Sequence, residues 1–283
     1  MKKGLVLEGG AMRGLFTAGA LDVMMEAGLT FDGLIGVSAG AAFGCNYKSG
    51  QIGRTIRYNL KYCRDPRYCS VRSLLKTGDL YGAEFCYRQI PKELDPFDSA
   101  AFEASPMEFH VVATDVSTGD AVYRRLDKDD EALLNWIRAS ASMPFVSRAV
   151  EIDGGHYLDG ALADSIPLAY FEHIGYDRNI VILTNESGYE KHPMPMAPAV
   201  RLALRKYPKA AEALLHRHEK YNETLRTIAE KEARGEILVI RPEEKMPIKR
   251  VSHDEKKLSY VYQMGRNTAS RRLEEIRTFL EKM

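Results

Sequence analysis

One serine stands in a setting that favours nucleophilic catalysis. Ser38 is the centre of a Gly-x-Ser-x-Gly pattern, Gly36 to Gly40, between the apolar residues 34–35 and the small residues 39–42. A turn of this kind between a strand and a helix is typical of a nucleophile elbow, which lifts a serine hydroxyl out of a sheet. Glycines flank the serine because a Cβ would collide where the two backbones approach. By itself the pattern predicts either a catalytic serine or a structural turn.

A second glycine-rich segment, Gly9-Gly10-Ala11-Met12-Arg13-Gly14, follows the apolar strand predicted at residues 5–7. Consecutive glycines let several backbone N–H groups converge on one anion. Parallel strands end at one edge of a sheet, so this loop is expected beside Ser38. Its amides and the amide of Ala39 are candidate donors for an oxyanion hole.

Two other uses of the same glycines are disfavoured. A phosphate-binding loop ends in Gly-Lys-Ser/Thr, but Leu15 follows Gly14, and a dinucleotide motif needs a glycine where Ala11 stands. The role of Arg13 stays open between a contact to a bound anion and an ion pair with Glu8 or an aspartate.

A serine nucleophile needs a base, and the sequence offers an aspartate more clearly than a histidine. Asp159 follows a short apolar strand, so its carboxylate would lie at a strand end, where α/β sites are built. Burial would raise its pKa and make it a stronger base. The other interpretation of Asp159 is a hairpin turn before Gly160. His156 and His173 remain open as bases, whereas Asp153 fits a turn better than a site.

Three motifs, in this order and spacing, resemble the patatin-like phospholipase family. They are Gly9-Gly10-x-x-Arg13-Gly14, Gly36-x-Ser38-x-Gly40 and Asp159-Gly160-Ala161. The segments 139–145 and 152–160 resemble the family's approach to its aspartate. The likeness covers residues 4–185, and residues from 200 onward resemble the extra helical C-terminal region of some bacterial members.

The resemblance implies a role for each matched residue. Ser38 would be the nucleophile and Asp159 its only base, a Ser–Asp dyad without histidine. The implied oxyanion hole consists of Gly9, Gly10, Ala11, Met12, Arg13 and Ala39, and the motifs are supported by Gly14, Gly36, Gly40, Gly160 and Ala161. Family members often carry a third glycine where this chain has Ala11, and alanine adopts a positive φ less readily.

The activity that the resemblance implies is hydrolysis of acyl esters of phospholipids and other lipids, with no metal and no cofactor. Two alternatives on the same fold stay open: an acyltransferase, and a non-catalytic module that binds a lipid or an anion. Product analysis and labelling of Ser38 by a serine-directed probe would separate the three.

The order of elements predicts a patatin-like three-layer α/β/α fold with a mostly parallel central sheet. Strand, helix, strand and helix alternate through the first 50 residues, and such units form parallel sheets with right-handed crossovers. Residues 51–105 predict short helices, and a lid or a substrate-facing cap stays open as their role. Residues 109–114 and 121–124 predict a hairpin. We expect an acyl hydrolase domain at 1–197 and a mostly helical extension with one strand at 198–283. In that extension, Ser252 and Glu255 predict a capping box before one long final helix.

Bulk composition narrows the function classes. The net charge of the 283 residues is +1, which disfavours nucleic acid as a partner. The four cysteines form no Cys-x-x-Cys pair, which favours reduced thiols and a cytoplasmic location. Peripheral membrane contact stays open through a basic segment that contains Arg201, Arg205, Lys206, Lys209, Arg217 and Lys220. The pair His216 and His218 fits a solvated helix face better than a metal site.

Overall fold

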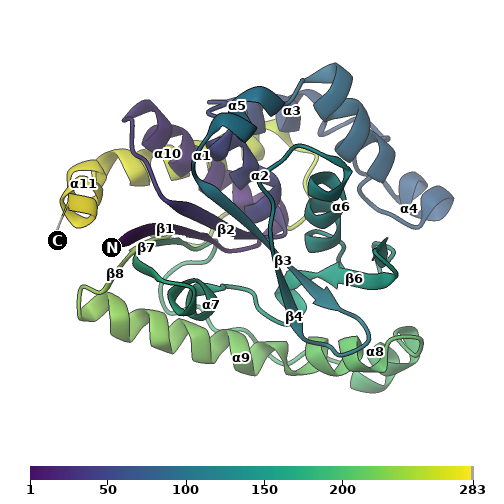
Figure 1. Cartoon of the computed structure of the whole chain (residues 1–283). Coiled ribbons are helices and arrows are strands. Elements are labelled where there is room, and N and C mark those ends of the chain that lie inside the picture. Colours follow the sequence, from purple (N-terminus) through teal and green to yellow (C-terminus); the bar gives the residue numbers. More distant parts are fainter. Residues whose placement is uncertain (282–283) are drawn as a thin grey trace.

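The computed structural model describes residues 1–281 and is built around one mixed sheet (Figure 1). The strands are β1 (Lys2–Leu7), β2 (Gly33–Val37), β3 (Glu108–Asp115), β4 (Ala121–Arg125), β5 (Val150–Ile152), β6 (Gly155–Asp159), β7 (Tyr176–Ile182) and β8 (Ile237–Ile240). Their order across the sheet is β5-β6-β3-β2-β1-β7-β8, with β4 paired to β3. The strands from β3 through β2, β1 and β7 to β8 are parallel neighbours.

Helices cover both faces of the sheet. The helical elements are η1 (Ala11–Arg13), α1 (Gly14–Glu26), α2 (Ala39–Lys48), α3 (Arg54–Tyr62), α4 (Val71–Thr77), η2 (Phe85–Leu94), α5 (Ser99–Ala104), α6 (Glu131–Ser140), η3 (Gly160–Leu162), α7 (Leu168–His173), α8 (Ala197–Ala203), α9 (Pro208–Ala233), α10 (Glu255–Arg271) and α11 (Leu273–Glu281). In Figure 1, α1, α2 and α10 lie above the sheet, and α7 and α9 lie below it. The predicted three-layer fold with a mostly parallel sheet is therefore confirmed.

The two layers follow from the alternation of side chains along each strand. Leu5, Leu7 and Leu34 are buried on the side of α1 and α10. Val6 and Ile35 are buried on the opposite side, against residues of α7 and α9. Because both faces are covered, both sets are apolar, and the strands read as continuous hydrophobic runs.

The C-terminal region completes the same sheet. Strand β8 pairs with β7 in parallel, and α10 lies against α1. The two helices approach so closely that a Cβ on Gly19 would lie 2.1 Å from the Tyr262 carbonyl oxygen, and one on Gly265 would lie 1.9 Å from that of Phe16. Side chains larger than hydrogen are therefore excluded at both glycines.

Two expectations for the C-terminal helices were wrong. The final apolar stripe belongs to two helices, α10 and α11, which are separated at Arg272. The cap of α10 is Asp254, whose carboxylate accepts the amides of Lys256 and Lys257, whereas Ser252 Oγ accepts the amide of Asp254. Serine and aspartate can both cap a helix. Whether Ser252 or Asp254 accepts the free N–H groups depends on the residue at which the helix begins.

Candidate active site

Ser38 lies at a sharp turn between β2 and α2. Its backbone has φ 55° and ψ −121°, a region that non-glycine residues occupy only when the surroundings enforce it. A Cβ on Gly36 would lie 2.5 Å from the Ala41 nitrogen, and one on Gly40 would lie 2.5 Å from the Leu7 carbonyl oxygen. The turn thus has the geometry of a nucleophile elbow, and both flanking glycines are sterically required.

Strand pairing brings Asp159 to Ser38. Val37 at the end of β2 lies opposite Val112 in β3, and the next residue of β3, Ala113, lies opposite Asp159 at the end of β6. The Ser38 hydroxyl is close enough to the Asp159 carboxyl group to favour its charged form. Both side chains are buried, and Asp159 Oδ1 also accepts the Ala161 amide at 2.8 Å. The strand pairing therefore places Asp159, and not Asp153, beside Ser38. Asp153 lies exposed in the β5–β6 turn, with φ 50°.

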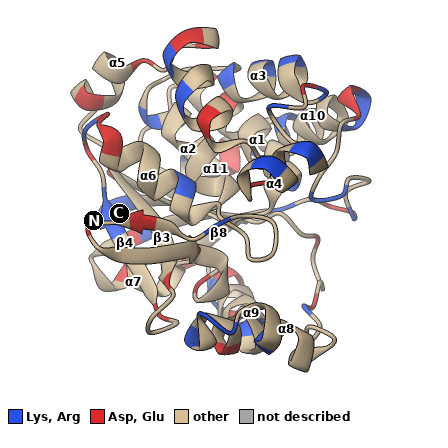
Figure 2. Cartoon of the chain, turned by 90° about the vertical axis from the view of Figure 1, so that its right-hand side faces the viewer, with Lys and Arg blue, Asp and Glu red and all other residues tan. Residues whose placement is uncertain are grey.

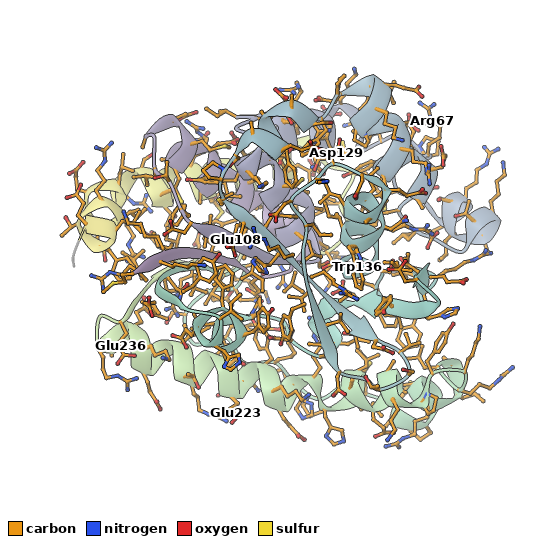
Figure 3. All side chains as sticks on the ribbon, in the orientation of Figure 1. Arg67, Glu108, Asp129, Trp136, Glu223 and Glu236 are labelled. Atoms are coloured by element: carbon orange, nitrogen blue, oxygen red, sulfur yellow. The ribbon has the colours of Figure 1, made fainter. Side chains whose placement is uncertain are left out.

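A segment at the end of α6 holds both residues. The resemblance singled out residues 139–145 but did not predict that they contact Ser38 and Asp159. The Ser38 amide donates to Ser140 Oγ at 2.8 Å, and the Asp159 amide donates to the Ser142 carbonyl oxygen at 2.9 Å. Trp136 of α6 packs on Tyr157 of β6, with ring centroids 4.7 Å apart, and Figure 3 shows Trp136 between these two elements. One helix end thus positions the serine and the aspartate together.

Burial changes the acidity of the Asp159 carboxyl group. Desolvation raises the pKa of Asp159 above its ordinary value, and Arg217, the Ala161 amide, the Ser38 hydroxyl and Arg250 partly oppose this. A carboxylate with a raised pKa accepts a proton more readily. The geometry and the environment of Asp159 therefore suit a general base.

The glycine-rich loop lies against the elbow. A Cβ on Gly9 would lie 3.0 Å from the Ser38 Cβ, and Ala11 has φ 50°, so alanine adopts the left-handed conformation here. Two of the six amides implied as oxyanion donors have protein acceptors: that of Met12 donates to the Arg250 carbonyl at 3.2 Å, and that of Arg13 to the Gly10 carbonyl at 3.1 Å.

The other four amides are available. Within residues 1–281, none of them donates to another protein atom. They belong to Gly9, Gly10, Ala11 and Ala39. An oxyanion beside Ser38 would find its donors in this set.

The histidines left open as bases lie in other surroundings. His156 is in β6, and its ring is a neighbour of Tyr207, with centroids 6.4 Å apart. His173 is exposed at the end of α7. His110 in β3 is buried and bonded to Glu108. In the part of the chain that the structure describes, none of these three rings is hydrogen-bonded to Ser38 or Asp159.

A cavity of about 140 Å³ opens beside Ser38. Apolar side chains from α2, α3, η2 and α6 line most of it, among them Phe43, Tyr58, Ile90 and Ile137. The helices of residues 51–105 thus form one wall of the cavity. The apolar lining suits a hydrocarbon group.

Comparison with known proteins gives two family matches. A model described as patatin-like phospholipase matches residues 5–172, which is more than half of the chain. A model described as a domain of unknown function (DUF6363) matches residues 207–281. The first match contains Ser38 and Asp159.

Similar proteins occur in bacteria and fungi. The protein YjjU of Escherichia coli is 30% identical over 197 residues, 64% of this chain and 51% of that protein. The NTE family protein Rv1063c of Mycobacterium tuberculosis is 26% identical over 65% of this chain and 49% of its own length. Lysophospholipase nte1 of Emericella nidulans is 28% identical over 62% of this chain but only 11% of its own length. This chain therefore spans about half the length of the bacterial relatives.

Among solved structures, that of VipD from Legionella pneumophila aligns with 97% of this chain and 67% of its own, at 13% identity and a TM-score of 0.46.

Proposed function

Because this chain belongs to the patatin-like phospholipase family, we propose that it is a serine hydrolase of lipid acyl esters. The family membership confirms the resemblance that the three motifs predicted. The single observation that supports the chemistry is that strand pairing brings the Ser38 hydroxyl, held at a strained elbow, to the buried Asp159 carboxyl group.

In the first half of the reaction, Ser38 Oγ attacks the ester carbonyl carbon while Asp159 takes the hydroxyl proton. The carbonyl oxygen becomes an oxyanion, which the free amides of the glycine-rich loop and of Ala39 stabilise. When the tetrahedral intermediate collapses, the bond to the leaving alcohol breaks and Asp159 gives its proton to that oxygen. The fatty acyl group is then esterified to Ser38.

In the second half, a water molecule replaces the alcohol. Asp159 accepts one proton from water as its oxygen attacks the acyl carbon, and the same amides stabilise the second oxyanion. Collapse breaks the bond to Ser38 Oγ, which regains the proton from Asp159, and a fatty acid leaves. The apolar cavity beside Ser38 would hold the acyl chain through both steps.

The test is labelling and turnover in matched variants. We expect Ser38→Ala to lose both hydrolysis of a p-nitrophenyl ester and covalent labelling by an alkyl organophosphonate. Asp159→Asn should fold normally and lose most of the rate, because an amide cannot accept the proton. Ser49→Ala, at the opposite end of α2, is the control for loss of a buried serine hydroxyl. Full turnover by Ser38→Ala would exclude the mechanism.

The same assays separate the remaining alternatives. Inactivation by His156→Ala or His173→Ala, with Asp159→Asn active, would replace the dyad with a histidine base. Transfer of the acyl group to added glycerol in preference to water would identify an acyltransferase. A folded protein that neither turns over esters nor reacts with the phosphonate would be a binding module.

We also propose that the protein contacts membranes through the side that carries α4. On this helix Val71 is 67% exposed and Leu75 is 84% exposed, and Phe145 in the adjoining loop is 50% exposed. The Leu80 amide, just after α4, donates to the Val146 carbonyl at 2.8 Å, which ties this loop to the helix. Basic side chains accompany these apolar ones on α4, as Figure 2 shows in blue. Apolar side chains with basic neighbours suit an anionic bilayer surface.

The basic segment singled out in the sequence is less suited to that role. Arg201 is paired with Glu212, with Nε and Oε1 2.8 Å apart, and Arg217 is half-buried. No helix among residues 1–281 has the length and hydropathy that crossing a bilayer requires.

A further inference from the structure

Four cationic side chains that are distant in the sequence gather beside the proposed dyad. They are referred to together as the cationic cluster: Arg13, Lys191, Arg217 and Arg250. Three of them come from the C-terminal half of the chain, from the loop after β7, from α9 and from the loop before α10.

A chain of contacts through Tyr221 joins three members. The Arg13 guanidinium donates to Asn185 Oδ1, and Asn185 Nδ2 donates to the Tyr221 hydroxyl at 2.9 Å. The Lys191 ammonium lies 4.1 Å from the centre of the Tyr221 ring. Arg217 lies four residues before Tyr221 on α9, so the two occupy one face of that helix.

Backbone contacts bring the cluster to the dyad. The Arg250 carbonyl accepts the Met12 amide at 3.2 Å, which places Arg250 at the glycine-rich loop next to Arg13. Arg217 Nε donates at 3.2 Å to Ser165 Oγ, which in turn donates to the Ala161 carbonyl two residues after Asp159. Asp159 itself interacts electrostatically with Arg217 and Arg250.

The positive charge of the cluster is not matched by protein carboxylates. Among residues 1–281, no carboxylate oxygen lies within 4.0 Å of the four cationic groups, and the buried Arg13 Nε has no hydrogen-bond partner. Glu8 and Asp159 act on the cluster from a longer distance, and Glu8 already accepts bonds from Thr184 and from Tyr221 at 2.6 Å. Four cations with two nearby carboxylates leave an excess of positive charge, which costs free energy unless an anion binds.

The protonation of Lys191 reflects this excess. Burial, and then repulsion from Arg217, Arg250 and Arg13, lower the pKa of Lys191 to about 7. A bound anion would raise the pKa of Lys191 again, because it would favour the charged ammonium.

We propose that the cationic cluster binds the phosphate ester of the substrate's head group, so that the acyl chain and the phosphate lie on different sides of Ser38. This inference rests on the proposed lipid hydrolase function. The apolar cavity is lined by Ser38 but by none of the four cations, so the two parts of an amphiphilic substrate have separate places. Guanidinium groups match the several acceptor oxygens of a phosphate, and Arg250 is exposed, which leaves the cluster open to solvent.

The first experiment compares two substrates that differ only in the phosphate: 1-oleoyl lysophosphatidic acid and 1-oleoylglycerol. Both are presented in the same neutral detergent micelles, so that surface charge of a membrane does not contribute. The double variant Lys191→Gln/Arg250→Gln should raise KM for the lysophosphatidic acid about tenfold or more, since charge-assisted contacts are lost. The ratio of the KM for lysophosphatidic acid to the KM for 1-oleoylglycerol should therefore rise about tenfold or more, because any effect of Arg250 on Asp159 is common to both substrates.

Lys220→Gln, which removes one positive charge at an exposed position of α9, is the control for loss of charge and should change the kinetics of neither substrate. Equal effects of the double variant on both substrates, or no effect on either, would overturn the proposal. If the double variant does not fold, Arg250→Gln alone serves the same comparison, because Arg250 is exposed.

The second experiment measures binding without turnover. In Ser38→Ala, calorimetry should show binding of lysophosphatidic acid that weakens tenfold or more when Lys191→Gln/Arg250→Gln is added. Inorganic phosphate that binds as tightly as the lipid would overturn the head-group assignment and identify a site for free phosphate.

The two proposals fail in different ways. Phosphate-dependent binding by a protein that hydrolyses neither ester would leave the head-group site standing and exclude the hydrolase function. Hydrolysis of both esters that does not depend on the cationic cluster would support the hydrolase function and exclude the head-group site.

Discussion

Replacement of Ser140 by alanine tests how the nucleophile is held. The Ser38 amide donates to Ser140 Oγ at 2.8 Å, and both residues are buried. Without the hydroxyl, the amide loses its acceptor and water cannot easily replace it, which costs about 1–3 kcal/mol. Ser38 can then relax from its positive φ, which releases strain of a similar size, about 1–3 kcal/mol.

These two contributions to the free energy of unfolding oppose each other, so the net loss of stability should be smaller than either alone. The catalytic rate has no second contribution that would offset its loss. A relaxed elbow moves Ser38 Oγ away from Asp159, and a displacement of about 1 Å can cost about 100-fold in rate. We therefore expect Ser140→Ala to lower kcat about 10-fold to 100-fold with KM nearly unchanged.

The assay is steady-state hydrolysis of a neutral p-nitrophenyl ester, together with the rate of phosphonate labelling at Ser38 and thermal unfolding. Tm should fall by only a few degrees, since about 1 kcal/mol corresponds to roughly 2–4 °C for a protein of similar size. Ser49→Ala is the control, and Ser140→Cys, which restores a weak acceptor, should recover part of the rate. A folded Ser140→Ala protein with unaltered kcat would refute the reasoning.

Three further predictions concern the base, the cavity and the membrane surface. Arg217 lowers the pKa of Asp159, so Arg217→Gln should raise it and move the acidic limb of the pH–kcat profile to higher pH with a neutral ester, whereas Lys220→Gln should leave the limb in place. Ala42→Phe should narrow the cavity and reduce kcat/KM for long acyl chains about fourfold for each methylene excluded, at about 0.8 kcal/mol per methylene, with butyrate esters little affected; equal losses for all chain lengths would contradict this. Leu75→Asp should reduce co-flotation with anionic vesicles at low salt while hydrolysis of a water-soluble ester stays unchanged; undiminished flotation would remove α4 from the contact.

Local features of the fold could be predicted because their causes are local. The strand, the turn and the helix around Ser38 occupy contiguous residues, and the glycine spacing reports a steric requirement within that segment. The hairpin of β3 and β4 and the short helices of residues 51–105 were predicted from turn residues and prolines in the same way.

The end of the chain shows where local patterns are insufficient. Ser252 and Asp254 are both good capping residues, and only the position at which α10 begins to pack decides between them. The break at Arg272 likewise lies within one continuous apolar stripe. The apolar periodicity indicates which face of a helix is buried, but it does not indicate where the helix axis changes direction.

The sequence by itself determined the serine, the glycine-rich loop and the family, because each depends on residue types at short, fixed spacing. Only the tertiary structure decided that Asp159 meets Ser38, that Ser140 holds the elbow, and that cations from four separate segments gather near these residues. These relations depend on the pairing of β2, β3 and β6 and on the way α9 and the later loops return to the sheet. Hydrogen bonds and Coulomb interactions act over a few ångströms in space, and chain distance does not specify which remote residues come that close.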